Sequence, residues 1–277
     1  MARPPTGERS GPRDIAELRA LATRQPDLTT AAALHAELVT AVRRVESRIT
    51  TPSLDLSTDL LQTRLSRGVP MASFGEFPVD WTEVRLLIRQ ITDVFRRLDV
   101  IDQAATARLH TAGRDGSLSE RARVWYDQPL TPGQDAGADE PDPMWPEVLQ
   151  WAMRPFLIRT AEVLTRRVDL QLWGRGHCPV CAAEPEFGAI TSTGAHILLC
   201  GRCHTRWPFE RGCPFCSHHD TADLRTFATA DRVYRVTRCG KCDRYLKLLD
   251  TQAAGRALLP FFDPVATLPL DAAMMQG

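Results

Sequence analysis

The cysteines are the residues of this chain whose type and spacing could do chemistry. The 277 residues include eight cysteines, and all eight lie in Cys-x-x-Cys pairs. Two residues between two cysteines form a tight turn that aims both sulfur atoms at one point. Two such turns facing each other close a tetrahedral four-sulfur metal site. The four pairs are Cys178 and Cys181, Cys200 and Cys203, Cys213 and Cys216, and Cys239 and Cys242.

The spacing of the pairs along the chain predicts which of them share a metal. Eighteen residues separate the first two pairs and twenty-two separate the last two, close to the spacing of zinc ribbons, in which a β-hairpin joins two pairs. Only nine residues separate Cys203 from Cys213, too few for a comfortable hairpin. We therefore predict one site from the first four cysteines and a second from the last four. The interleaved order of a cross-brace module is the alternative.

Other roles for the cysteines are less well supported. The segment from Met1 to Asp14 is polar and rich in proline and has no apolar core of a secretory signal, so we predict a cytoplasmic protein, where disulfides are rare. A dithiol redox motif needs a strand that enters a helix, whereas Pro179 and Pro214 stand in loop-like runs. A purely structural metal remains the main alternative to a redox-active one. Four sulfur ligands leave no open coordination position, and a small ribbon needs the metal in order to fold.

Histidines are the other candidate ligands in this half of the chain. With four sulfurs already available to each site, we interpret them as turn or surface residues. His204, directly after Cys203, is the one that could donate a hydrogen bond to a sulfur. The histidines concerned are His177, His196, His204, His218 and His219.

The first 173 residues contain no cysteine, and their apolar residues recur at helical spacing. Asp14 is placed to cap the first helix, and a proline-rich, acidic run at 127–146 is predicted to be a surface loop. The predicted helices span about 14–21, 30–49, 54–65, 81–101, 117–125 and 147–172.

From Gly174 onward, short β-prone runs between turn-rich cysteine pairs replace the helical pattern. The predicted strands are 195–199, 205–209, 224–228, 232–237 and 245–249. The predicted fold class is α+β, with an all-helical N-terminal domain followed by two small rubredoxin-like or zinc-ribbon metal modules. The predicted divisions are a helical domain at 1–173, ribbons at 174–211 and 212–250, and a C-terminal tail at 251–277.

Composition excludes several functional classes. Lys and Arg total 34, as do Asp and Glu, so the net charge is zero and gives no basic footprint for nucleic acid. No run approaches the ~20 apolar residues of a membrane span. No phosphate-binding glycine loop, nucleophile elbow or metalloprotease motif occurs, and no nucleophile–base constellation or open metal site can be pointed to, so no enzyme activity is predicted.

Longer motifs surround the cysteine pairs. They are Met153-Arg-Pro-Phe-Leu leading to Trp173, Gly176-His-Cys-Pro-Val-Cys181, Leu199-Cys-Gly-Arg-Cys203 followed by Trp207, Cys213-Pro-Phe-Cys216, and Cys239-Gly-Lys-Cys-Asp-Arg-Tyr-Leu-Lys247 running into Leu248-Leu-Asp250. Weaker features are Gly68-Val-Pro70 and Leu268-Pro-Leu-Asp271. Together these stretches resemble the formate dehydrogenase accessory protein FdhE family, most specifically over about residues 145–250.

The resemblance implies a cytoplasmic accessory protein without enzyme activity that binds two iron ions, or zinc instead, through the eight cysteines. It implies that the partner is the catalytic subunit of a molybdenum or tungsten formate dehydrogenase, engaged during maturation. Self-association is left open. The rival hypotheses are a rubredoxin-like electron-transfer protein and, less well supported, a double zinc ribbon that binds nucleic acid.

One position of each cysteine pair departs from the family pattern. Family members commonly have glycine directly after the second cysteine, where the backbone turns. An aspartate tolerates a left-handed backbone more readily than an alanine does. The residues at these positions here are Ala182, His204, Ser217 and Asp243.

Overall fold

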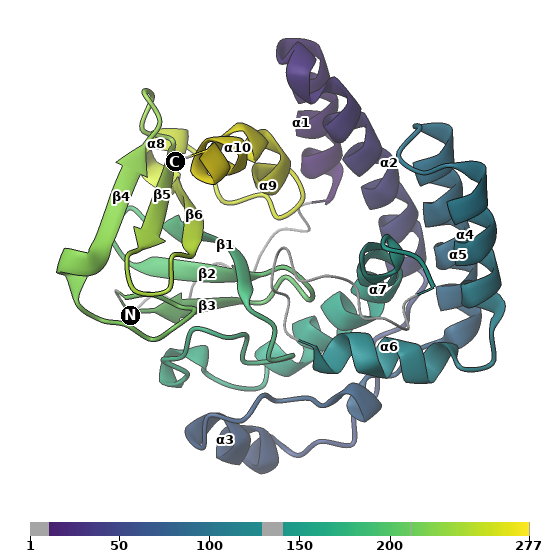
Figure 1. The fold of residues 1–277 in the computed structure, drawn as a ribbon. Helices are drawn as coiled ribbons and strands as arrows, with labels where there is room; N and C mark the ends of the chain where they lie inside the picture. The colour runs from purple at the N-terminus through teal and green to yellow at the C-terminus, as the bar shows by residue number, and fades with distance from the viewer. Residues whose placement is uncertain (1–10, 129–140, 211, 277) are drawn as a thin grey trace.

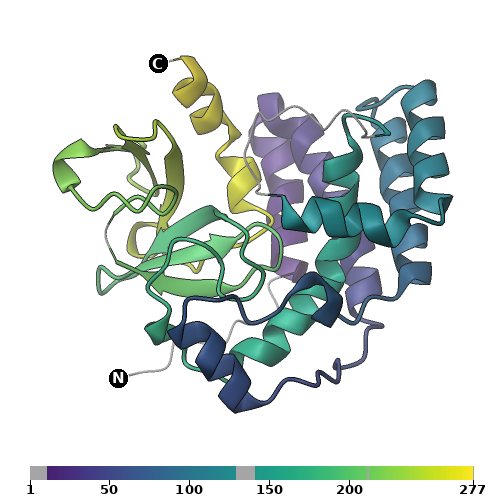
Figure 2. The ribbon, with the colours of Figure 1, turned by 60° about the horizontal axis from the view of Figure 1, so that its bottom comes forward.

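A computed structural model describes residues 11–128, 141–210 and 212–276 of the chain (Figure 1). Helices gather on one side of the molecule and strands on the other, and the C-terminal helix, in yellow, lies between them (Figure 2). The predicted fold class is therefore confirmed: a helical N-terminal part precedes a sheet that carries the cysteines. The residue divisions at 173, 211 and 250 stay a prediction.

The helical part contains seven α-helices in the described residues. Short 3-10 turns lie at Pro26–Leu28, Phe74–Glu76 and Leu170–Leu172. The helices are α1 (Gly11–Arg24), α2 (Thr29–Glu46), α3 (Thr58–Ser66), α4 (Trp81–Arg97), α5 (Gln103–Arg114), α6 (Leu118–Asp127) and α7 (Trp145–Thr165).

Two features of this part differ from the sequence prediction. The predicted helix at 81–101 ends at Arg97, and a separate helix α5 follows, with the Asp102 side chain accepting the N–H of Ala105 at its start. Asp14 lies within the first turns of α1 and does not cap it. Its buried carboxylate accepts the backbone N–H groups of Phe261 and Phe262 at 3.0 and 3.1 Å, so it fastens the C-terminal segment to α1. Most of the predicted loop at 127–146 lies outside the described residues.

The six strands of the described residues form one sheet in the order β3-β2-β1-β6-β5-β4. The first ribbon supplies β1, β2 and β3, the second supplies β4, β5 and β6, and both ribbons are antiparallel. The two ribbons join where β1 and β6 pair in parallel. The bounds are β1 (Pro185–Ile190), β2 (His196–Cys200), β3 (Arg206–Phe209), β4 (Leu224–Ala228), β5 (Tyr234–Cys239) and β6 (Tyr245–Asp250).

Strand β1 is the strand that the sequence does not predict. It begins at Pro185 and contains Gly188, both of which weaken a strand pattern. Gly188 stands at the join between the ribbons, where a Cβ atom would lie 2.9 Å from the carbonyl oxygen of Ile197 and 2.7 Å from a methyl group of Leu248. The close approach of β1 to its neighbours therefore requires glycine there.

The C-terminal residues fold back onto the sheet. They contain the short helices α8 (Thr251–Ala254) and α9 (Asp263–Ala266) and the helix α10 (Leu268–Gln276). The carboxylate of Asp271 on α10 accepts a hydrogen bond from the hydroxyl of Tyr245 at 2.9 Å and pairs with the ammonium of Lys247. Two residues of the longest cysteine motif thus hold the last helix in place.

An ion pair stabilises the segment that leads from α3 to α4. The guanidinium of Arg64 donates to both carboxylate oxygens of Glu76 at 2.8 Å, and it also donates to the carbonyl of Met71 at 2.7 Å. Glu76 accepts the backbone N–H and hydroxyl of Ser73 as well. These hydrogen bonds, that of Arg64 first, lower the pKa of Glu76 to about 2.

Glu76→Gln should therefore lower the free energy of unfolding at pH 7 by about 1–3 kcal/mol. Because the pKa of Glu76 is depressed, its contribution is present above about pH 4.5 and is lost as the pH falls toward 2. Denaturant unfolding across this range should show the difference between wild type and variant shrinking on acidification. Glu83→Gln, which removes the more exposed pair with Arg48, is the control and should cost about 0.5 kcal/mol or less. A difference that is independent of pH would contradict the assignment.

Candidate metal centres

The four cysteine pairs share one backbone turn. In each pair, the N–H of the residue directly after the second cysteine donates to the carbonyl of the first cysteine. The N–H of the first cysteine in turn donates to the carbonyl of the residue two places after the second cysteine. The donor–acceptor distances for the first kind are 3.1, 3.1, 3.0 and 2.9 Å along the chain, and for the second 2.8, 3.0, 2.8 and 2.9 Å. A turn of this kind holds both sulfur atoms on one side, as the spacing predicts.

The residue after each second cysteine has a left-handed backbone although none of the four is glycine. This conformation costs an L-residue about 1–2 kcal/mol, and each turn is closed by the two hydrogen bonds above. The φ angles are 62° at Ala182, 55° at His204, 56° at Ser217 and 60° at Asp243.

The first cluster brings together Cys178, Cys181, Cys200 and Cys203. The sulfur of Cys181 lies 3.4 Å from that of Cys200 and 3.6 Å from that of Cys203, and the sulfurs of Cys178 and Cys203 are 3.5 Å apart. All four residues are at most 2% exposed. The hydroxyl of Thr205 lies 3.0 Å from the sulfur of Cys203.

The second cluster brings together Cys213, Cys216, Cys239 and Cys242. The sulfurs of Cys213 and Cys242 are 3.6 Å apart, and those of Cys216 and Cys239 are 3.8 Å apart. Cys213 and Cys239 are buried, whereas Cys216 is exposed and Cys242 is partly exposed. Both clusters follow the consecutive order that the spacing predicts, and the interleaved order is not the one adopted.

Both clusters have the donor chemistry and the dimensions of a four-thiolate metal site. A tetrahedron with metal–sulfur bonds of about 2.3 Å has sulfur–sulfur edges of about 3.8 Å, and disulfide sulfurs are about 2.05 Å apart. The observed separations of 3.4–3.8 Å agree with the tetrahedron, and all eight cysteines are free. Four sulfur ligands suit zinc and iron alike.

At Cys239 the local backbone favours the thiolate form that a metal requires, whereas burial raises the pKa of the Cys213 thiol in the same cluster. Burial alone would raise the pKa of the Cys239 thiol, but the N–H groups of Cys242 and Lys241 and the adjoining thiols outweigh it and lower this pKa to about 7. A thiol with such a pKa gives up its proton near neutral pH, which metal binding needs.

The histidines lie outside both clusters. His177 packs edge-on against Trp173, and His218 pairs with Asp223 at 2.8 Å. The ring of His204 packs edge-on against Phe261 with centroids 4.5 Å apart, so we find no support for the predicted contact with a sulfur. None of these histidines belongs to a cluster, and the side chains of His177 and His204 pack on aromatic rings, a packing role that the sequence interpretation did not include.

Arginines beside the cysteines are the site residues that the sequence pattern did not single out. Arg202 lies between the two cysteines of the second pair and is buried, and Arg244 follows Cys242-Asp243 and forms a two-pronged ion pair with Glu184 at 2.6 Å. Arginine makes up most of the basic residues of this chain, so these two arginines do not stand out by residue type. Their position next to a cysteine was the available signal.

Several curated proteins with similar sequences are FdhE homologues. No protein-family model matches the chain. A "Protein FdhE homolog" of Actinobacillus pleuropneumoniae is 25% identical over 207 residues, 71% of this chain and 62% of the relative. One of Aquifex aeolicus is 29% identical over 125 residues, 43% of each chain, and one of Haemophilus influenzae is 31% identical over 102 residues, 35% of this chain and 33% of the relative. These matches support the FdhE family for this chain.

A solved FdhE structure shares the fold of this chain. The crystal structure of the FdhE protein from Pseudomonas aeruginosa matches with a TM-score of 0.68 at 21% identity and covers 98% of this chain and 92% of that one. The matched sequence stretches span less than two thirds of each of the three curated FdhE relatives. Among the described residues, no helix combines the length and apolar character that crossing a membrane requires.

The metal-ligand role of the eight cysteines is a prediction that metal analysis tests. Purified protein should hold two ions of zinc or iron per chain, and Cys178→Ser and Cys213→Ser should each hold one. Elemental analysis of each variant against protein concentration gives the count. Retention of two ions by either variant, or loss of both by Cys213→Ser, would contradict two separate four-thiolate sites.

Ala182→Gly should stabilise the protein by about 0.5–1 kcal/mol, because glycine removes the strain of a left-handed backbone at an exposed position. The control is Ala107→Gly on the exposed face of α5, which should destabilise by about 1 kcal/mol. Denaturant unfolding of the metal-loaded proteins measures both. Equal destabilisation by the two substitutions would show that the turn carries no strain.

Proposed function

We propose that this protein is a cytoplasmic accessory factor that binds the catalytic subunit of a formate dehydrogenase during its maturation. Similarity to the FdhE family is the observation that carries the proposal, together with two complete four-cysteine clusters that could hold metal ions. The matched relatives carry only the name FdhE, and the partner follows from the resemblance of the cysteine motifs to the accessory proteins of that enzyme.

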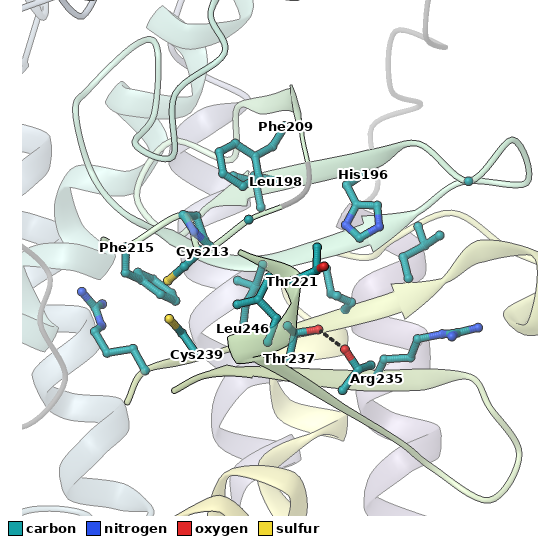
Figure 3. A pocket seen from close by; sticks show the side chains of 18 residues that line it. His196, Leu198, Phe209, Cys213, Phe215, Thr221, Arg235, Thr237, Cys239 and Leu246 are labelled. Carbon is teal, nitrogen blue, oxygen red and sulfur yellow. Dashed lines mark hydrogen bonds between the residues drawn. The ribbon is translucent and has the colours of Figure 1, made fainter. Parts of the chain in front are cut away.

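The chemistry of the clusters supports an accessory role more than an enzymatic one. A metal held by four thiolates has no open position for substrate or water. The cavity at the sheet, of about 350 Å³, is lined by apolar, threonine and arginine side chains together with His196, Cys213 and Cys239, and His196 lies at the opposite end from both cysteines (Figure 3). Both lining arginines already pair with carboxylates, Arg235 with Asp250 and Arg244 with Glu184. These residues supply no nucleophile–base pair.

An electron-transfer role is the second candidate, and the exposure of Cys216 is the observation that favours it. A rubredoxin-like iron centre passes electrons through solvent-facing sulfur ligands, and the second cluster has such ligands. Iron in the sites would permit this role, and zinc would exclude it because zinc has no accessible redox step. A visible iron–thiolate absorption band that bleaches reversibly under dithionite would favour electron transfer.

A tagged copy of the chain should co-purify the formate dehydrogenase catalytic subunit from cells that express both, because an assembly factor holds its client before the mature enzyme forms. Quantitative mass spectrometry of the eluate, against an unrelated tagged protein of similar size, measures the enrichment. Deletion of the gene should also lower formate dehydrogenase activity. Absence of association together with normal activity after deletion would reject the proposal.

A further inference from the structure

The two cysteine clusters share one local structure but differ in their surroundings. We propose that the first centre retains its metal and links the helices to the sheet. The second centre, in contrast, exchanges its metal, because incoming ligands can reach it. This proposal concerns the residues around each cluster and does not depend on the identity of the partner protein.

The helical part holds the first turn of the first centre through its backbone. The N–H of Met71 donates to the carbonyl of Pro179 at 2.8 Å, and the N–H of Ala72 donates to the carbonyl of Val180 at 3.1 Å. Pro179 and Val180 are the two residues between the cysteines of the first pair. Displacing Cys178 or Cys181 from a metal therefore disturbs the packing of the segment before α4.

The second turn of the first centre is held even more strongly. The buried guanidinium of Arg202 donates to the carbonyl oxygens of Tyr126 at 2.7 Å, Trp125 at 3.1 Å and Gln128 at 2.7 Å, at the end of α6. It also lies 4.6 Å from the ring centre of Trp125. Arg154 of α7 donates to the carbonyl of Gly201 at 2.8 Å. Both residues between Cys200 and Cys203 thus bind helices.

The second centre has no matching contacts with the helices among the described residues. Its turns are Cys213-Pro-Phe-Cys216 and Cys239-Gly-Lys-Cys242, so Lys241 occupies the position that corresponds to Arg202. Lys241 is exposed. All four cysteines of the first centre belong to the main hydrophobic core, whereas none of the second centre does.

In the described part of the chain, two contacts attach the second centre to the first ribbon, and Phe215 also packs against the edge of the main hydrophobic core. Phe215, between Cys213 and Cys216, lies under the guanidinium of Arg244, 3.9 Å from the ring centre, and Arg244 pairs with Glu184 of the first ribbon. A Cβ atom on Gly176 would lie 1.9 Å from the carbonyl oxygen of Pro214, so the backbones touch there. Both contacts are local, and opening the second centre leaves the helix–sheet junction closed.

The cavity at the sheet gives a ligand a route to the second centre. Figure 3 shows Cys213 and Cys239 beside Phe215 at one end of this cavity, with His196 and Arg235 at the other. Cys216 is exposed and Cys242 partly so. A chelator can therefore replace the exposed sulfur ligands one at a time, whereas it reaches the first centre only after the core opens. Local opening needs less free energy than opening the core.

Metal release from zinc-loaded protein tests the proposal. Excess pyridylazoresorcinol, a chromophoric chelator, should remove one zinc ion in a fast phase and one in a slow phase, with rates that differ roughly ten-fold or more. Cys216→Ser should abolish the fast phase and leave the slow phase and the thermal stability of the helical part nearly unchanged. A single phase for both ions, or a fast phase that persists in Cys216→Ser, would overturn the proposal.

Arg202→Met and Lys241→Met form a matched pair for the same experiment, since they replace corresponding residues of the two ribbons and leave all eight cysteines in place. Arg202→Met should accelerate the slow phase several-fold, because it removes three hydrogen bonds to α6. Lys241→Met should leave the slow phase unchanged. Equal slow-phase rates in the two variants would show that the contacts of Arg202 do not protect the first centre.

Discussion

Four sulfur atoms held at 3.4–3.8 Å from one another are the constraint on which the sheet part depends. As thiolates they repel one another strongly in a buried site, so a bound cation stabilises the arrangement, and a four-thiolate site around a divalent ion keeps a charge of about −2. The first cluster lies beside two buried guanidinium groups, Arg154 and Arg202, that offset such a charge. Arg202 at the same time neutralises the carbonyl end of α6, where the helix dipole is negative. Charge compensation and docking of the helices therefore use the same side chains.

The second constraint is the join between the ribbons. Each ribbon alone is a small antiparallel unit that buries little apolar surface. The parallel pairing of β1 with β6 makes one sheet of both, although β2, β3, β4 and β5 all lie between these two strands in the sequence. Gly188 permits the close approach, and β6 then presents alternate side chains to opposite faces. Leu246 and Leu248 line the cavity, while Tyr245 and Lys247 reach Asp271 on the other face.

The sequence predicts what is local in this fold and misses what depends on distant partners. The order of the cysteine clusters follows from loop lengths, and most helices follow from apolar periodicity. Strand β1 was not predicted because Pro185 and Gly188 are unfavourable in a strand, and only its pairing with the neighbouring ribbon explains them. Helix α5 was not predicted because small residues (Ala105, Ala112 and Gly113) supply three of its four buried positions. Asp14 is predicted to cap a helix, but its carboxylate accepts the N–H groups of Phe261 and Phe262, which lie almost 250 residues away in the sequence. No local pattern reveals a contact over that separation.

The difference between the two centres rests on one pair of corresponding residues. Both ribbons repeat the order Cys-Pro-x-Cys and Cys-Gly-basic-Cys, with Arg202 in the first and Lys241 in the second. A guanidinium has five donors in a rigid plane, so it can serve three carbonyl oxygens at a helix end while its face packs on Trp125. An ammonium group is more strongly hydrated and cannot offer that planar fan of donors, so burying it at the same place would leave carbonyl oxygens unsatisfied. Arginine therefore suits the turn that is buried against α6, and lysine suits the turn that faces water.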